Sequence, residues 1–159
     1  MTFVRLRTTI GLMKETTRIP FLAGRLSEAA SEFIVEALNR EGFTDLLPCH
    51  GDILHVLTVQ ESATVLELAR LTHRSKSTVS ALVSKLADLG YIERKRSSLD
   101  SRVVHLSLTQ RGRDFIPIAE KISWELHALI TEGMTPAETE AVEALLKRLI
   151  LRFEEKKTI

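Results

Sequence analysis

The sequence predicts a mainly α-helical protein with one small β-hairpin. Between Ser75 and Gly90 the apolar residues recur every three or four positions, which is the spacing of one face of an α-helix. Directly after Gly90 the period changes to two, as in a strand. Long stretches of helical periodicity lie at both ends of the chain. We therefore expect a helical centre that carries the hairpin, flanked by N- and C-terminal helices.

Composition favours a soluble, cytoplasmic protein that has no membrane partner. The 159 residues are 44% apolar and 27% charged, which suits one domain, or a small domain with helical extensions. No apolar run approaches the roughly 18 residues that span a bilayer, and the N-terminus lacks the apolar block of a signal peptide. The single cysteine, Cys49, excludes an intrachain disulfide framework.

The first helices can be placed from their end signals. Pro20 suits the first turn of a long helix that ends near Gly42, and a second helix is expected from about His50 to Val59. Thr64 and Glu67 have the spacing of a capping box, in which each side chain satisfies a free backbone N–H of the other residue. They predict the start of a short helix.

That short helix and the helix from Ser75 to Gly90 are joined by a turn at residues 72–74, which is the helix-turn-helix pattern. Ser75 is a good N-cap and Gly90 a good stop. Opposite the apolar stripe lie small or polar side chains, namely Ser77, Ala81, Ser84 and Asp88, with Thr78 and Lys85 beside them. Small side chains allow a helix to approach the major groove of DNA closely. The alternative for this helix alone is an ordinary amphipathic core helix.

The hairpin that follows is expected to pair residues 91–94 with residues 103–108, and the loop 95–102 between them is polar and basic. A hairpin directly after a recognition helix is the wing of a winged helix-turn-helix. Basic side chains on a wing can reach phosphates or the adjacent minor groove. The alternative is a solvated hairpin loop, but the wing is favoured by three consecutive basic residues, Arg94, Lys95 and Arg96.

Charge is concentrated in this central segment. Eight lysines or arginines and three acids between Arg70 and Arg102 leave a net charge of +5 there, although the whole chain carries only +1. Such a basic centre is typical of a surface that binds a polyanion. The candidate DNA-binding residues are Arg74, Ser75, Lys76, Ser77, Thr78, Ala81, Lys85, Arg94, Lys95, Arg96 and Arg102.

Two long helices are expected at the C-terminal end. Thr109 can cap the first, and a second capping box, Thr135 with Glu138, opens the last. A core of about 60 residues cannot easily bury the apolar stripes of these helices and of the N-terminal helix, so a second subunit is expected to cover them. The predicted division is an N-terminal dimerisation segment at 1–45, a DNA-binding lobe at 46–109 and C-terminal dimerisation helices at 110–159.

Three motifs together give the chain a family resemblance. They are KSTVSALVSKLADLGYIER at 76–94, the Asp100-Ser-Arg102 triplet in the wing, and LTQRG at 108–112. In this ordered set the chain resembles the MarR family of winged helix-turn-helix transcriptional regulators, from about residue 20 to 155. It departs from many members at Ser98, where they have proline in the wing loop.

The resemblance implies a homodimer that binds a pseudo-palindromic operator in double-stranded DNA. It implies that helix 75–90 lies in the major groove and wing 91–108 at the minor groove. Arg102 would be the minor-groove probe, and Asp100 would orient it through an ion pair; a carboxylate two residues away can hold a guanidinium in a fixed fork. The family's usual role further implies a repressor released by a small-molecule effector.

Relatives often bind small aromatic or phenolic acids, and Arg25, His50 and Trp124 are candidates to line such an effector site. Cys49, near a helix N-terminus, is a candidate redox residue. The five histidines and Cys49 raise the idea of a metal sensor, but no HxxxH or CxxC spacing is present, so neither a metal nor a cofactor is predicted.

Other classes of function are less well supported. The sequence has no glycine-rich phosphate loop, GxSxG or HExxH motif, so no enzyme is predicted. The remaining alternatives are a winged-helix module for protein–protein contact, and a redox- or metal-responsive regulator of the same fold. The basic centre distinguishes a DNA-binding protein from a protein-binding module, which has no general need for it.

Overall fold

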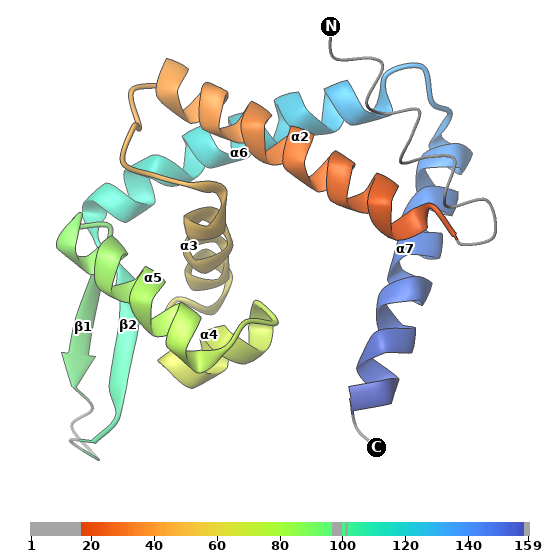
Figure 1. Cartoon of the computed structure of the whole chain (residues 1–159). Coiled ribbons are helices and arrows are strands. Elements are labelled where there is room, and N and C mark those ends of the chain that lie inside the picture. The colour runs from red at the N-terminus through yellow and green to blue at the C-terminus, as the bar shows by residue number, and fades with distance from the viewer. Residues whose placement is uncertain (1–16, 97–99, 101, 158–159) are drawn as a thin grey trace, which may run out of the picture. The chain divides into compact units, whose positions relative to one another are not determined.

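The chain is mainly helical, with one antiparallel β-hairpin, as the sequence predicts (Figure 1). The computed structural model describes residues 17–96, 100 and 102–157, so positions 1–16 of the N-terminal segment and Ser98 lie outside it. The described elements are α2 (Ile19–Arg40), α3 (Pro48–Gln60), α4 (Val65–Leu71), α5 (Lys76–Asp88), β1 (Ile92–Arg96), β2 (Val104–Leu108), α6 (Gln110–Thr131) and α7 (Pro136–Lys157). None of the described helices is long and apolar enough to cross a membrane.

The chain divides into two compact units, residues 1–122 and 123–159, and the division falls within α6. The first unit holds the helix-turn-helix, the hairpin and the described hydrophobic core. The second unit holds the end of α6 and all of α7.

Helix α5 begins and ends where its sequence signals place it. The Ser75 hydroxyl accepts the N–H of Thr78 at 3.1 Å, and Gly90 takes a left-handed conformation with φ of 77° just after the helix. The inner face is buried through Val79, Val83 and Leu86. Because α5 packs against α3, α4 and β1, its opposite face is left for solvent or a partner.

The capping box before α4 is present. The Thr64 N–H donates to Glu67 Oε2 at 2.7 Å, and the Glu67 N–H donates to Thr64 Oγ1 at 3.3 Å. The Thr64 N–H, and next the Thr64 hydroxyl, donate to the Glu67 carboxylate and hold its pKa below the usual value. In the turn before α5, His73 occupies the left-handed region with φ of 51°, which is the conformation that glycine usually provides in such a turn.

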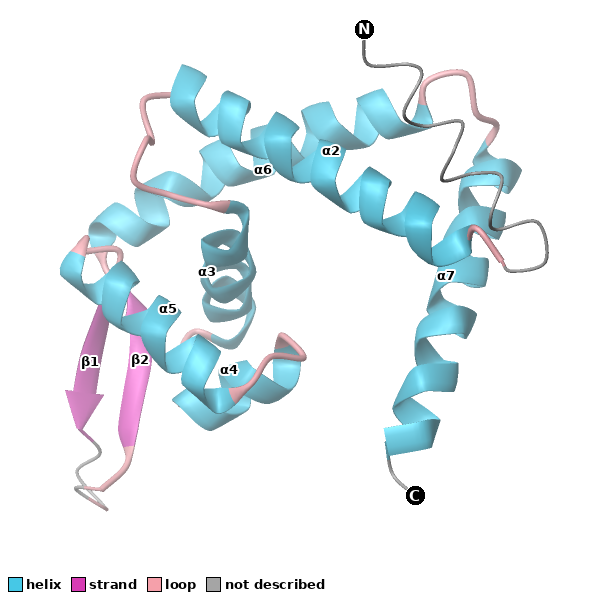
Figure 2. Ribbon diagram, in the orientation of Figure 1, coloured by secondary structure: helices cyan, strands magenta, loops and turns pink. Residues whose placement is uncertain are grey.

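The hairpin pairs β1 with β2 in register from Ile92↔Leu108 to Arg96↔Val104 (Figure 2). A bridge that the sequence did not predict ties it to the chain before α4. There Ala63 and Leu106 exchange two backbone hydrogen bonds, at 3.0 and 2.9 Å. This bridge joins the base of the wing to the start of the helix-turn-helix.

The core of the first unit also fixes the start of α6. Tyr91 is fully buried, and its ring lies edge-on to Phe115. Arg111 stacks over the Tyr91 ring at 4.5 Å. A Cβ at Gly112 would overlap the carbonyl oxygen of Tyr91, so only glycine allows this approach of the helix to the backbone before β1.

In the second unit, the predicted capping box opens α7. The Thr135 N–H donates to Glu138 Oε2 at 2.8 Å, and the Glu138 N–H donates to Thr135 Oγ1 at 3.3 Å. None of the α7 side chains that the structure describes is buried. Its apolar stripe is therefore without cover in the single chain; the exposed members are Val142, Leu145, Leu146, Ile150 and Phe153.

Element ends differ from the sequence expectation by one or two residues. Helix α3 begins at Pro48 rather than His50 and ends at Gln60 rather than Val59. The first strand is Ile92–Arg96, because the Tyr91 N–H donates to the Leu86 carbonyl at the end of α5 and so belongs to the helix stop.

Candidate nucleic-acid interface

The N-terminus of α5 presents a cluster of three hydroxyl groups. Ser75 Oγ lies 2.9 Å from Ser77 Oγ and 2.8 Å from Thr78 Oγ1, and it also caps the helix. These bonds use most of the hydrogen-bonding capacity of Ser75 and orient Ser77 and Thr78. All three residues are exposed. The cluster therefore offers two oriented hydroxyl groups beside the orphan N–H groups of a helix start.

The exposed face of α5 continues with small side chains. Ser77, Ser80 and Ala81 are exposed and Ser84 is half-buried, so nothing long stands between the helix backbone and an approaching surface. Lys76 and Lys85 flank this strip, and neither is ion-paired with an acid that the structure describes. The geometry suits close approach to a polyanionic groove.

Arg74 differs from the free cation expected at this place. Its Nη2 lies 2.8 Å from Asp52 Oδ2 on α3, and its Nε is buried without a hydrogen-bond partner. Its guanidinium is thus held against α3, where it braces the turn between α4 and α5. Charge alone cannot reveal this, because the partner lies on another helix.

The three consecutive basic residues of the first strand lie on two faces of the hairpin. Arg94 is paired across the strands with the buried Leu106, so it shares the inward face with Ile92; Arg96 follows on that face. Lys95 is paired with His105 on the other face. The run of three basic residues in the sequence suggests a single basic surface, but side chains alternate along a strand, so Arg94 and Arg96 lie on one face and Lys95 on the other.

The wing ion pair is present in the form that the family resemblance implied. Arg102 Nε and Nη2 each donate to Asp100 at 3.1 Å, to Oδ1 and Oδ2 respectively, and the Arg102 N–H donates to Oδ1 at 2.9 Å. These bonds hold the pKa of the Asp100 carboxyl below its usual value. The Arg102 side chain is 89% exposed and therefore available to a partner.

The three candidate effector residues occupy different environments. Arg25 is exposed on α2 and bonded to Glu28 at 2.6 Å, whereas His50 is only 3% exposed and its Nδ1 accepts the Leu47 N–H at 3.0 Å. Trp124 belongs to the second unit; it is 71% exposed and lies edge-on to His127. No described bond links the three side chains. Their shared effector role stays a prediction.

Cys49 lies half-buried in the first turn of α3. The part of the chain that the structure describes contains no group of three histidine, cysteine or acidic side chains placed to hold a metal. The redox and metal-responsive alternatives therefore gain no geometric support from these residues.

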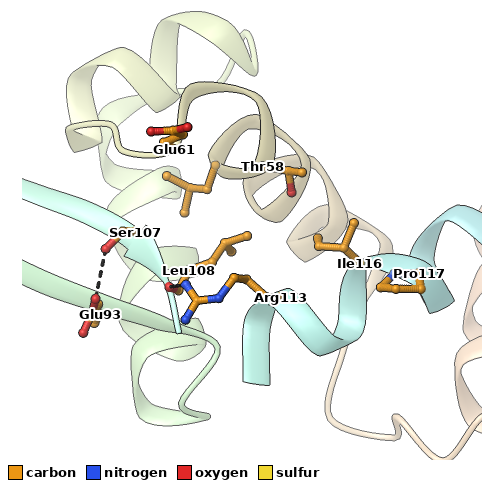
Figure 3. A pocket seen from close by; sticks show the side chains of 9 residues that line it. Thr58, Glu61, Glu93, Ser107, Leu108, Arg113, Ile116 and Pro117 are labelled. Atoms are coloured by element: carbon orange, nitrogen blue, oxygen red, sulfur yellow. Dashed lines mark hydrogen bonds between the residues drawn. The ribbon is translucent and has the colours of Figure 1, made fainter. Parts of the chain in front are cut away.

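A pocket of about 520 Å³ lies in the first unit, and none of its lining residues belongs to α5 (Figure 3). It is lined by Leu57, Thr58, Glu61, Glu93, Ser107, Leu108, Arg113, Ile116 and Pro117. Arg113 donates to the Leu108 carbonyl at 2.7 Å, and Ser107 donates to Glu93 at 3.3 Å. The lining is mostly apolar and includes charged side chains of both signs, Glu61, Glu93 and Arg113. None of the three candidate effector residues lines it.

A helix-turn-helix followed by a paired hairpin with an exposed, ion-paired arginine defines a winged helix-turn-helix protein. Comparison with known proteins agrees: residues 42–103 match the MarR family. The resemblance seen in the sequence is confirmed, and this segment is a MarR-family domain, in a chain with the fold of the family's transcriptional regulators.

Three similar proteins illustrate the match. An uncharacterised HTH-type transcriptional regulator of Bacillus subtilis, YybA, is 21% identical over 76% of this chain and 81% of its own. A variant of Escherichia coli MarR, solved with operator DNA, is 22% identical with a TM-score of 0.74, over 87% of this chain and 97% of that one. BpsR of Bordetella bronchiseptica, whose DNA binding is regulated by 6-hydroxynicotinic acid, is 20% identical with a TM-score of 0.68, over 84% and 98%.

Proposed function

We propose that this chain is a sequence-specific regulator that binds double-stranded DNA as a homodimer. Helix α5 enters the major groove through Ser77, Thr78 and Ala81, and Arg102 of the wing reaches the adjacent minor groove. Two observations together carry the proposal. The exposed face of α5 is lined by small and hydroxyl-bearing side chains, and on the wing Asp100 holds the Arg102 guanidinium through two side-chain hydrogen bonds. An exposed arginine fixed in this way is suited to the negative potential of a narrow minor groove.

Phosphate contacts are assigned to flexible cations that form no ion pair with an acid in the described part of the chain. Lys76 and Lys85 flank the bare face of α5, and Arg96 lies farther along the wing. Arg74 is assigned mainly to bracing the turn, because Asp52 already holds it. Lys95 lies on the other face of the hairpin and is expected to contribute through long-range attraction only.

Dimerisation rests on the uncovered apolar stripe of α7 and on exposed apolar residues at the start of α2, which are Ile19, Phe21, Leu22 and Leu26. Exposed apolar side chains gathered on a helix in this way mark an interaction site. A two-fold dimer also places two recognition helices about one turn of DNA apart, which matches a pseudo-palindromic operator. On this proposal residues 1–45 and 110–159 serve dimerisation, and residues 46–109 bind DNA.

Effector control follows by analogy with relatives, and BpsR in particular responds to a small aromatic acid. We expect a repressor whose operator is released by such a compound, with Arg25, His50 and Trp124 as first candidates. The test is to measure operator affinity with and without a panel of aromatic carboxylic acids. Equal affinity throughout the panel would remove this part of the proposal.

The rival function is a winged-helix module that binds protein. Salt dependence separates the two, because each phosphate contact releases counterions and steepens the fall of affinity with salt. We expect tight binding to selected duplex fragments, weakened strongly between about 50 and 200 mM salt. Absence of duplex binding at low salt would favour the protein-binding alternative.

A further inference from the structure

A side-chain hydrogen bond joins the first strand of the wing to the recognition helix. Arg94 Nη2 on β1 donates to the Ser84 hydroxyl on α5 at 2.8 Å. The contact joins two elements of the first unit that pack directly on each other. We propose that Ser84 is a positioning residue of the DNA interface, which holds the Arg94 guanidinium beside the bare face of α5 so that helix and wing bind DNA as one unit. This inference rests on the proposed DNA-binding function.

The placement of Ser84 makes this role specific. It lies three residues after Ala81 and seven after Ser77, so it continues the bare strip of α5 by a further helical turn. Its half-buried hydroxyl is where this strip meets the hairpin. A guanidinium held there extends the α5 surface with a positive charge that the helix does not itself supply.

Arg94 retains the means to bind DNA. A guanidinium has five N–H donors, and the contact with Ser84 uses one. Among the residues that the structure describes, no acid forms an ion pair with Arg94. Its charge is therefore not neutralised, and the other donors can reach a phosphate. The exposed Asp88, one turn beyond Ser84, would repel the DNA backbone and so limits how far this surface extends.

The next residue provides a matched control. Lys95 carries the same charge one position along β1, but it is paired with His105 on the opposite face of the hairpin. A contribution from general positive charge would be shared by Arg94 and Lys95. A contribution from positioning by Ser84 belongs to Arg94 alone.

A double-mutant cycle on duplex binding tests the inference. The protein is the full chain, and the probe is a duplex fragment that it selects from genomic DNA. We expect Arg94→Ala to weaken binding and to shallow the salt slope by about one unit. Ser84→Ala should weaken binding about fivefold, roughly the worth of one hydrogen bond. When combined with Arg94→Ala, Ser84→Ala should weaken binding no further. When combined with Lys95→Ala, it should weaken binding by the same factor as in the wild type. Ser84→Thr, which retains a hydroxyl, should restore affinity.

Other results of the cycle would contradict either the positioning role alone or the proposed DNA-binding function as well. An inert Ser84→Ala, or an effect that persists in the Arg94→Ala background, overturns the positioning role while leaving the proposed function in place. A wild-type protein that binds no duplex overturns the proposed function and this inference together. Alanine favours helix, so thermal melts of the Ser84→Ala variant should match the wild type and exclude a folding defect.

Discussion

At the scale of single residues, the polar contacts of the first unit are of two kinds, those between residues close in sequence and those between different helices and strands. The Ser75 cap and the Thr64–Glu67 box join residues three apart in sequence, so their spacing reveals them, whereas the Asp100–Arg102 ion pair was implied by the family resemblance. Arg74 and Arg94 instead find Asp52 and Ser84 on other elements. Their charge predicted a basic surface, but not which cations are held by protein.

The sign of one substitution tests the role of Asp100. If Asp100 acts only as a negative charge near DNA, Asp100→Asn should strengthen binding. If it orients Arg102, the same change should weaken binding, because the charge-assisted fork is lost. We expect Asp100→Asn to weaken operator affinity and Arg102→Ala to weaken it further, by about 1–3 kcal/mol in binding free energy. Anisotropy titrations at fixed salt measure both, with the distant Arg25→Ala as control; tighter binding by Asp100→Asn would contradict the orienting role.

His50 should make stability depend on pH. Burial first, and the nearby positive charge of Lys85 second, lower the pKa of His50 below its usual range, while Asp45 opposes this. Protonation would also convert Nδ1 from acceptor to donor and lose the bond from the Leu47 N–H. Because the folded pKa is lowered, the unfolded chain binds the proton more tightly. Stability is then full above about pH 6.5 and falls as pH drops through the folded pKa.

Urea unfolding between pH 7.5 and 5.5 measures this effect. The free energy of unfolding of the wild type should fall more steeply with acid than that of His50→Gln, by at most roughly 1.4 kcal/mol per pH unit. The glutamine can still accept the Leu47 N–H but does not titrate. Parallel pH profiles for the two proteins would show that His50 does not contribute.

At the scale of elements, caps and periodicity predicted every helix and strand from α2 onward, within a few residues at each end. The bridge between Ala63 and Leu106 was missed, because a two-residue pairing leaves no periodic pattern and its partner lies far along the chain. The split of Arg94 and Lys95 onto two hairpin faces follows from strand alternation once the register is fixed.

Two glycine substitutions compare a position where a helix closely approaches the backbone of another segment with an ordinary helical position. Gly112→Ala places a methyl group on the Tyr91 carbonyl oxygen and should destabilise the fold by about 1–3 kcal/mol, or more if the backbone must move. Gly51→Ala, in α3, meets nothing within 4 Å and should stabilise by up to about 1 kcal/mol. Denaturant unfolding of both variants measures the difference. A neutral Gly112→Ala would mean that the start of α6 does not need this contact.

At the scale of the whole molecule, the sequence predicted helices too apolar for a small core, and the structure leaves the α7 stripe exposed in the single chain. The sequence of one chain shows that the apolar stripe needs to be covered, but it does not show which surface of a second chain covers it. The proposed dimer accounts for these exposed residues, because burial against a copy of the chain removes them from water.

A charge placed on the α7 stripe should break that dimer. Ile150 is 58% exposed in the single chain, so Ile150→Glu should spare the fold of the monomer but disrupt a buried interface. Ala144→Glu introduces the same charge on the other side of the helix and should leave the dimer intact. Sedimentation velocity at micromolar concentration separates these outcomes. A wild type that sediments as a monomer would contradict dimerisation by this surface.

The most direct test of the central claim is a hydroxyl-radical footprint of the full chain on a duplex that it selects from genomic DNA. Two symmetric sets of protected positions, about 10 base pairs or a multiple of that apart, are expected from paired recognition helices. The outer minor-groove protections should disappear with Arg102→Ala, while the protection of the sugar-phosphate backbone beside each recognition helix, near the centre of each half-site, remains. A single asymmetric footprint, or wing protections that survive Arg102→Ala, would contradict the proposed arrangement of helix and wing on DNA.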